Sequence, residues 1–360
     1  MIEGNVVIDA TVHGFNFTLE NCRTEVVRQL RDHLHEFNVT LTPGTEYDLT
    51  REELYEQFAD QPELLPQMMF AESHTDVAVY HAVPLEGLYY DGSSPLWVGV
   101  AAAERYPERV YNYAAVYPWR EDAIERLERE AQQRNVIGVK FYPADLIGEQ
   151  FVPSLMNAES TFRVVERCRE LGIRMIGIHK AVPIGPFREV QPYFGVADCP
   201  PLVEAFPDMT FEIVHGGFAF LPETVELMRR YPNVVVNLEG VQTFMHGDPI
   251  RWNELIGAFL AVDGGEDRIF WSVAASALHP APWVPMFWRW ELPAGFPPLT
   301  QEIKAKILGG NYARAMGWDL PALAARLASD PFGTGDPVRP PWSWLREQRA
   351  GRAAGALAAG

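Results

Sequence analysis

Eight short apolar segments recur along this chain of 360 residues, and most of them are followed by a stretch with helical spacing. The first segment begins at Val6, and the others cover residues 76–83, 109–118, 136–143, 174–181, 210–217, 233–240 and 268–276. Because they are almost continuously apolar, they are typical of strands buried on both faces. Eight strands alternating with helices predict an α/β protein with a closed (β/α)8 barrel, a TIM barrel. A doubly wound open sheet is the alternative, but no Gly-x-Gly-x-x-Gly motif follows the first strand.

Two regions depart from this repeat. Residues 18–72 separate the first two strands by far more than one helix, which indicates a helical insertion after strand one that lies over the barrel mouth. We therefore expect residues 1–325 to form the barrel and residues 326–360 to form a C-terminal arm. The Pro/Gly-rich part of the arm, 330–345, is expected to pack on a partner, and the Ala/Gly-rich end, 350–360, predicts a disordered tail.

Composition and charge restrict the partners and the location. Hydrophobic residues make up 48% of the chain, as in a folded globular protein. The formal net charge of −18 repels phosphate backbones and anionic lipids, so we expect neither nucleic acid nor membrane partners. We also expect no signal peptide and no membrane helix. The three cysteines, Cys22, Cys168 and Cys199, form no metal or redox pattern, which predicts free thiols in a cytoplasmic protein.

Polar side chains stand where the apolar segments end, and in barrels of this kind that face carries the active site. Three of them are histidines, His13, His179 and His215, at the ends of segments one, five and six. A single histidine is usually a hydrogen-bonded core residue, but three at one mouth predict a divalent metal, most simply zinc, with iron or manganese as alternatives. Glu239 and His279, at or after the ends of segments seven and eight, are further candidate ligands.

Two other patterns have structural interpretations. His33 and His35 form a literal His-x-His pair, but they lie in a stretch with helical spacing, where residues two apart face different directions. We therefore expect a helix surface there. The aromatic-rich segment 280–293, which includes Trp283 and Trp290, is expected to form a subunit contact or a loop anchored on the barrel. If it were exposed, such a patch would favour an oligomer.

The motifs at the strand ends resemble those of a known family. They read DATVH at 9–13, GVKFYP at 138–143, GIHKA at 177–181, VHGG at 214–217 and ILGGNYARAMG at 307–317. Over about residues 5–320, their order and spacing are similar to the amidohydrolase superfamily, in particular the branch typified by aminocarboxymuconate semialdehyde decarboxylase. The resemblance implies one divalent metal bound by a strand-one His-x-His, a strand-five His and a strand-eight Asp, with a strand-six His beside the metal-bound water.

Carried over to this sequence, the resemblance makes His13 and His179 metal ligands, and His215 the strand-six histidine. Two positions depart from the family pattern. Thr11, which shares one strand face with His13, stands in place of the first histidine, and Ala274 stands in place of the aspartate. The resemblance therefore implies a metal site that has lost two of its four protein ligands.

These features favour a metal-dependent enzyme that acts on a small carboxylic acid or its derivative, by decarboxylation or by hydrolysis through a metal-bound water. His215 would orient or deprotonate that water. Lys140 and Arg188 are candidates to bind the substrate carboxylate, with a plain surface role as the favoured interpretation of Arg188. Lys140 also matches a strand-four lysine that some members of the superfamily carbamylate into a bridging metal ligand.

Two other functions stay open. One is a supporting, metal-binding subunit of a heteromeric non-haem metal oxygenase with this fold, similar to a two-component 2-aminoisobutyrate hydroxylase, whose homologous partner carries the complete active site. The other is a fold relic that binds a small molecule without chemistry. The expected assembly is a homodimer or a hetero-oligomer with a homologous barrel subunit.

Overall fold

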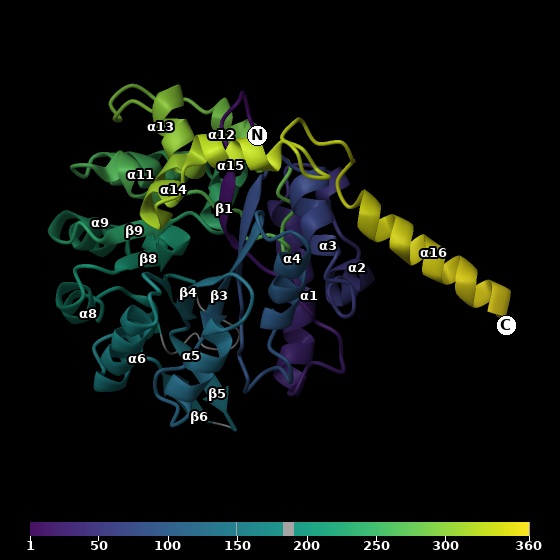
Figure 1. The fold of residues 1–360 in the computed structure, drawn as a ribbon, viewed down its shortest axis with the longest axis horizontal. Coiled ribbons are helices and arrows are strands. Elements are labelled where there is room, and N and C mark those ends of the chain that lie inside the picture. Colours follow the sequence, from purple (N-terminus) through teal and green to yellow (C-terminus); the bar gives the residue numbers. More distant parts are fainter. Residues whose placement is uncertain (149, 183–190, 360) are drawn as a thin grey trace.

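The computed structural model describes residues 1–148, 150–182 and 191–359. At its centre lies a sheet of eight parallel strands in the order β1-β2-β3-β4-β7-β8-β9-β10 (Figure 1). These strands are β1 (Ile8–Val12), β2 (Val77–His81), β3 (Val110–Ala115), β4 (Val136–Phe141), β7 (Met175–His179), β8 (Thr210–Val214), β9 (Val234–Asn237) and β10 (Ile269–Phe270). The sheet closes on itself, because Ala10 N donates to Trp271 O at 2.9 Å and Val12 forms a parallel bridge with Ala275. The predicted barrel is confirmed.

Burial explains why the strands are nearly continuous in apolar residues. All five residues of β1, of β2 and of β7 are buried, so each strand presents one face to the barrel interior and the other to the helices. The register brings Ala115 of β3 beside Lys140 of β4, and Lys140 beside Gly177 of β7. A lysine is thereby held inside the barrel among small neighbours.

Helices surround the barrel between successive strands (Figure 1). They are α4 (Leu96–Arg105), α5 (Ala123–Ala131), α6 (Glu159–Glu170), α7 (Gln191–Phe194), α8 (Pro200–Ala205), α9 (Leu221–Arg230), α10 (Phe244–Gly247), α11 (Pro249–Leu260), α12 (Trp283–Trp288), α13 (Gln301–Ala305), α14 (Asn311–Met316) and α15 (Leu320–Leu327). A small antiparallel hairpin, β5 (Ala144–Ile147) with β6 (Gln150–Pro153), follows β4 and was not expected from the sequence. Within the described ranges, no helix has both the length and the apolar character needed to cross a bilayer.

The insertion after β1 is helical, as expected. It contains α1 (Glu25–Leu41), α2 (Arg51–Glu56), α3 (Leu64–Pro66) and a π-helical turn over Gln67–Ala71. The side chains of Thr24 and Thr50 cap the first two helices by accepting backbone hydrogen bonds. Asn38 of α1 donates to Ala277 O at 2.7 Å, which joins the insertion to the loop after β10. His33 is exposed on α1, as the helical spacing predicted.

The C-terminal arm is attached to its own barrel at two points. Arg109, buried at the start of β3, forms an ion pair with Asp330 near the beginning of the arm. At the other end, the carboxylate of Glu72 accepts hydrogen bonds from the backbone N–H groups of Trp342 and Trp344 at 2.8 and 2.9 Å. The Pro/Gly-rich segment therefore packs within this chain, and the expectation of a partner at that segment stays a prediction.

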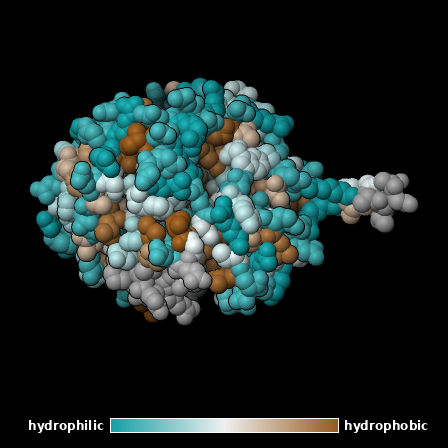
Figure 2. All heavy atoms as spheres, turned by 90° about the horizontal axis from the view of Figure 1, so that it is seen from below, coloured by the Kyte–Doolittle hydropathy of each residue, from teal (hydrophilic) through white to brown (hydrophobic). Residues whose placement is uncertain are grey.

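Helix α16 (Ser343–Ala359) continues from the arm and extends away from the barrel (Figure 1), forming a projection with a hydrophilic base (Figure 2). Ion pairs of Arg349 with Glu56 and of Arg352 with Asp60 hold it beside α2 and the loop that follows. The tail that was expected to be disordered is helical as far as the description reaches. The difference has a physical reason, since alanine has the highest helix propensity of all residues.

The aromatic segment after β10 is packed inward. Trp283 and Phe287 of α12 are completely buried and Trp288 is 5% exposed, and the rings of Phe287 and Trp252 meet edge to face at 6.1 Å. The segment is therefore anchored on its own barrel, as one of the two alternatives predicts, and a subunit contact there stays a prediction. The prediction of an oligomer loses this support and stays a prediction. The three cysteines are buried and unbridged, as expected.

Candidate active site

Five of the predicted site residues form one connected group at the carboxyl ends of the strands. None is more than 7% exposed. They are Lys140 in β4, His179 at the end of β7, and His13, His215 and Glu239, which follow β1, β8 and β9. The barrel thus brings together residues that lie up to 226 positions apart in the sequence.

The carboxylate of Glu239 is the centre of this group. Its Oε1 lies 2.7 Å from Nε2 of His13, and its Oε2 lies 3.2 Å from Nζ of Lys140. Nδ1 of His13 is 2.8 Å from the carbonyl oxygen of His81. Both ring nitrogens of His13 face oxygen acceptors, so Nδ1–H donates to the carbonyl of His81 and a second proton lies between Nε2 and the Glu239 carboxylate. Taken together, the His13 ring and the Glu239 carboxylate are then neutral. On this assignment His13, Glu239 and Lys140 together carry one net positive charge, and the further carboxyl that interacts with Lys140, Glu212, has its pKa raised by burial to about 7.

The electrostatic environment agrees with this assignment. Burial would raise the pKa of Glu239, but the Lys140 ammonium and the neighbouring histidines outweigh it and hold the pKa well below its usual range. Burial lowers the pKa of Lys140, and the Glu239 carboxylate opposes that shift. The two directions are consistent with an ammonium and a carboxylate that stabilise one another inside the barrel.

His179 and His215 form a second contact beside Glu239. Nδ1 of His215 donates to the carbonyl oxygen of Glu239 at 2.8 Å, and Nε2 of His179 donates to that of Val182 at 2.8 Å. The other two nitrogens, His215 Nε2 and His179 Nδ1, are 3.2 Å apart. Burial lowers the pKa of both rings. In neutral rings both facing nitrogens carry lone pairs, so this contact is a place where a proton or another cation is held.

Backbone strain marks two of the strand ends. His215 has a φ of 64° and Ala274 a φ of 61°, a region that residues with a Cβ rarely adopt. Such conformations cost free energy and persist where the surrounding structure fixes them, frequently at functional sites. At His215 the strained backbone directs Nδ1 onto the carbonyl oxygen of Glu239, which fixes the ring.

A polar layer below this centre was missed by the sequence analysis. Asn237 donates to Thr11 Oγ1 at 2.8 Å and to Glu212 Oε1 at 2.7 Å, and its own Oδ1 accepts from the backbone N–H of Glu239. Burial raises the pKa of Glu212 to about 7. His81 stacks on Tyr113 with ring centres 4.1 Å apart. His81 and Asn237 end apolar strands, so the same strand-end rule could have found them.

Comparison with known proteins decides the family. A model of the amidohydrolase family matches residues 22–318. The chain belongs to the amidohydrolase family. No curated protein matches its sequence. An uncharacterised TIM-barrel protein from Bordetella bronchiseptica has 17% identity and a TM-score of 0.61, with 86% of this chain and 98% of that chain covered.

Two decarboxylases have the same architecture. A 2,6-dihydroxybenzoate decarboxylase from Rhizobium is 15% identical, with a TM-score of 0.53 over 87% of this chain and 99% of that chain. A dihydroxybenzoic acid decarboxylase from Polaromonas, with bound manganese and an inhibitor, is 15% identical, with a TM-score of 0.52 over 87% of this chain and 97% of that chain. At such identities the similarity to this amidohydrolase-family chain concerns the fold alone.

The arrangement of donors in this member of the amidohydrolase family does not fit a divalent metal. Nε2 of His13 is taken by Glu239, and the Lys140 ammonium occupies the other oxygen of that carboxylate. The His179–His215 contact offers two nitrogens only. Across residues 1–148, 150–182 and 191–359, no three His, Cys, Asp or Glu side chains are grouped as a metal site. The predicted zinc site is thus not assembled in this arrangement, and a bound metal stays a prediction for experiment.

Elemental analysis of the purified chain tests that prediction. From the geometry we expect zinc, iron and manganese each well below one equivalent, because removing His13 from a three-histidine set leaves too few donors for a stable site. The measurement is metal quantification by mass spectrometry on wild type, His179→Ala and, as matched control, His33→Ala on the surface of α1. One equivalent in wild type and in the control, lost in His179→Ala, would establish the metal site instead.

One predicted site residue among those that the structure describes does not join the group. His279 lies elsewhere, because its Nε2 donates to Glu72 at 3.1 Å, its Nδ1 accepts from the backbone N–H of Ala281, and its ring meets Trp342 at 4.7 Å. The loop after β10 turns it toward the C-terminal arm in this structure, and its role as a metal ligand stays a prediction. Arg188, the other candidate for carboxylate binding, lies outside the described residues.

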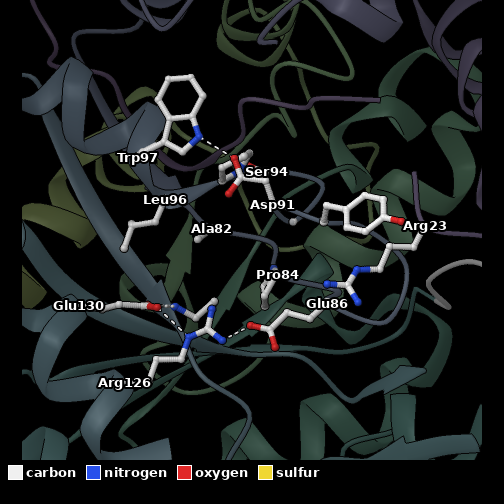
Figure 3. Close-up of a pocket in the computed structure, with 14 residues that line it drawn as sticks. Arg23, Ala82, Pro84, Glu86, Asp91, Ser94, Leu96, Trp97, Arg126 and Glu130 are labelled. Atoms are coloured by element: carbon white, nitrogen blue, oxygen red, sulfur yellow. Dashed lines mark hydrogen bonds and ion pairs between the residues drawn. The ribbon is translucent and has the colours of Figure 1, made fainter. Parts of the chain in front are cut away.

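A separate cavity of about 320 Å³ lies at the rim, beside α4 and α5 (Figure 3). Three of its five charged side chains form ion pairs with one another, while Arg23 donates to Tyr89 O and Asp91 accepts from an indole. Arg126 lies between Glu86 and Glu130, and Trp97 Nε1 donates to Asp91 at 2.8 Å. Because this cavity is lined by neither the histidines nor the lysine of the strand ends, the chemistry is assigned to the buried centre.

Proposed function

We propose that this amidohydrolase-family chain is an enzyme that acts on a small carboxylic acid, or on a derivative of one, by decarboxylation or hydrolysis. The observation that carries the proposal is the buried Lys140 ammonium beside a carboxylate that His13 already pairs with, at the end of the barrel where such enzymes bind substrate. A buried charge is costly unless it is paired. A substrate carboxylate would supply the missing negative charge.

The residues of the centre divide into two roles. Lys140 is the anion-binding group, because its ammonium is the unbalanced charge. His215 is the proton-transfer group, because its Nδ1 is fixed on a carbonyl oxygen and its Nε2 carries the lone pair. In a hydrolysis, Nε2 takes a proton from the attacking water and returns it to the leaving group. In a decarboxylation, a proton held at Nε2 is delivered to the carbon that loses carbon dioxide.

The fold-level relatives support this class of reaction. Two of the solved structures with this architecture are decarboxylases of dihydroxybenzoic acids. Their substrates are small aromatic monocarboxylates, which suits a centre with a single unbalanced positive charge. 2,6-Dihydroxybenzoate is therefore the first compound to assay with this chain.

The test is His215→Asn in an assay of carbon dioxide release from 2,6-dihydroxybenzoate and related acids, with hydrolysis of their amides and lactones in parallel. We expect the rate to fall by roughly 10² to 10⁴, the usual contribution of general acid–base catalysis. His33→Asn, at an exposed site on α1, is the control and should keep wild-type activity. Unchanged turnover in His215→Asn would exclude this histidine from the chemistry.

A supporting subunit is the second candidate, and specific observations favour it. Thr11 and Ala274 stand where the family resemblance implies metal ligands, and the described residues group no three metal-binding side chains. In that case the isolated chain is inert, and activity appears only when a homologous barrel is co-expressed with it. His215→Asn would then leave the activity of the complex unchanged, whereas loss of the partner's histidines would abolish it.

A further inference from the structure

Tyr142 has a buried hydroxyl with no hydrogen-bond partner among residues 1–148, 150–182 and 191–359. It lies two residues after Lys140, and residues two apart on a strand point to the same side, so its ring enters the barrel interior one step closer to the mouth than the lysine. Its ring centre lies 5.2 Å from Lys140 Nζ and 5.3 Å from the ring of His179. The side chain is therefore part of the wall around the positive centre.

An unpaired buried hydroxyl is unfavourable, and native proteins contain few of them. The neighbouring strand repeats the feature. Ala115 pairs with Lys140 in the register, so Tyr117, two residues beyond, lies near Tyr142. Within the described part of the chain, the Tyr117 hydroxyl is also buried without a partner. The backbone of Leu85 lies near the Tyr117 hydroxyl but does not meet hydrogen-bond geometry. Tyr117 adjoins Tyr142 and faces Asp145 and Glu86, whereas the Tyr142 ring lies against the Lys140 ammonium. An unpaired hydroxyl beside this positive centre indicates that its partner is a ligand.

We infer that the Tyr142 hydroxyl, assisted by that of Tyr117, donates a hydrogen bond to the carboxylate that Lys140 binds, and so selects carboxylate substrates over neutral ones. The inference rests on the proposed function and extends it by naming two specificity-determining residues. Burial raises the pKa of both tyrosines well above its ordinary value of 10, so both hydroxyls keep their protons and act as donors. The remaining oxygen of a carboxylate held by the Lys140 ammonium is the acceptor they lack.

Binding measurements on Tyr142→Phe test the inference. The probes are benzoate and 2,6-dihydroxybenzoate, with benzamide as the neutral comparison, and binding is followed by calorimetry. A hydrogen bond to a charged group corresponds to a change in Kd of roughly tenfold to a hundredfold, so we expect the carboxylates to bind that much more weakly. The melting temperature without ligand should stay equal or rise, because the substitution removes an unpaired polar group. Tyr117→Phe should act in the same direction.

Tyr80→Phe is the matched control. The Tyr80 hydroxyl donates to Pro95 O and contacts Ser94 Oγ, both at 2.7 Å, so its loss should lower the melting temperature and leave the Kd for benzoate unchanged. An unchanged Kd in Tyr142→Phe, with Lys140→Met abolishing binding, would overturn the inference and leave the proposed function intact. A wild-type chain that binds none of the carboxylates would overturn the proposed function, and the inference with it.

Discussion

Lys140→Met is expected to lower the free energy of unfolding by about 1.5–3 kcal/mol, because Glu239 loses a hydrogen bond from a charged donor while His13 remains paired with its carboxylate. Lys140 is fully buried, and its Nζ lies 3.2 Å from Glu239 Oε2. The same variant removes the ammonium that is proposed to bind the substrate carboxylate. Binding of benzoate and turnover should therefore be lost as well. Equilibrium denaturation and calorimetry measure the two effects separately.

Two further variants separate the effect on stability from the effect on benzoate binding. In Lys140→Met/Glu239→Gln both charges are removed, and most of the stability should return while binding stays absent. Lys304→Met is the matched control. Lys304 is also buried, but its Nζ donates to Trp288 O at 2.8 Å and it lies outside the centre, so binding should be unchanged. Wild-type stability in Lys140→Met would show that the ion pair does not form.

The barrel could be predicted because each strand can be recognised from its own apolar character and length. A run such as "VIGVKF", which became β4, is apolar on both faces and has the length of a strand, so no long-range information is needed to recognise it. The hairpin of β5 and β6 was missed for the opposite reason. Its residues are partly exposed and mixed in character, and it exists through pairing between neighbours such as Asp145 and Val152.

The candidate site could be predicted only as a set of residues. The strand-end rule placed Lys140, His179, His215, His13 and Glu239 at one mouth, and the structure brings them together. The rule could not predict that His13 pairs with Glu239 and His179 with His215. Pairing depends on side-chain directions and on charge balance inside a closed barrel, and neither can be predicted from a short stretch of sequence. For the same reason the contact between His279 and Glu72 was not predicted, since the two lie 207 residues apart.

Glu72 anchors the C-terminal arm to the barrel. Glu72 is 1% exposed and accepts hydrogen bonds from the backbone of Trp342 and Trp344, from Ser343 Oγ at 2.9 Å and from His279 Nε2 at 3.1 Å. Although burial would raise its pKa, these bonds and His279 outweigh that effect and lower it below its ordinary value of 4.5. Because the folded-state pKa is depressed, the carboxylate stabilises the fold above pH 4.5, and this stability is lost as the pH falls through the folded-state pKa.

Glu72→Ala should therefore cost about 3–5 kcal/mol near neutral pH and much less in acid, because four donors lose a charged acceptor at once. Once the arm is released, residues 330–345 should become cleavable in limited proteolysis. Activity should fall too, since His279 ends the loop whose Ala275 bridges Val12, next to His13, and closes the barrel. Glu121→Ala, at an exposed carboxylate on the surface, is the control for unfolding and proteolysis. If Glu72→Ala kept both the protected arm and full stability, the arm would be held by Arg109 and Trp342 packing alone.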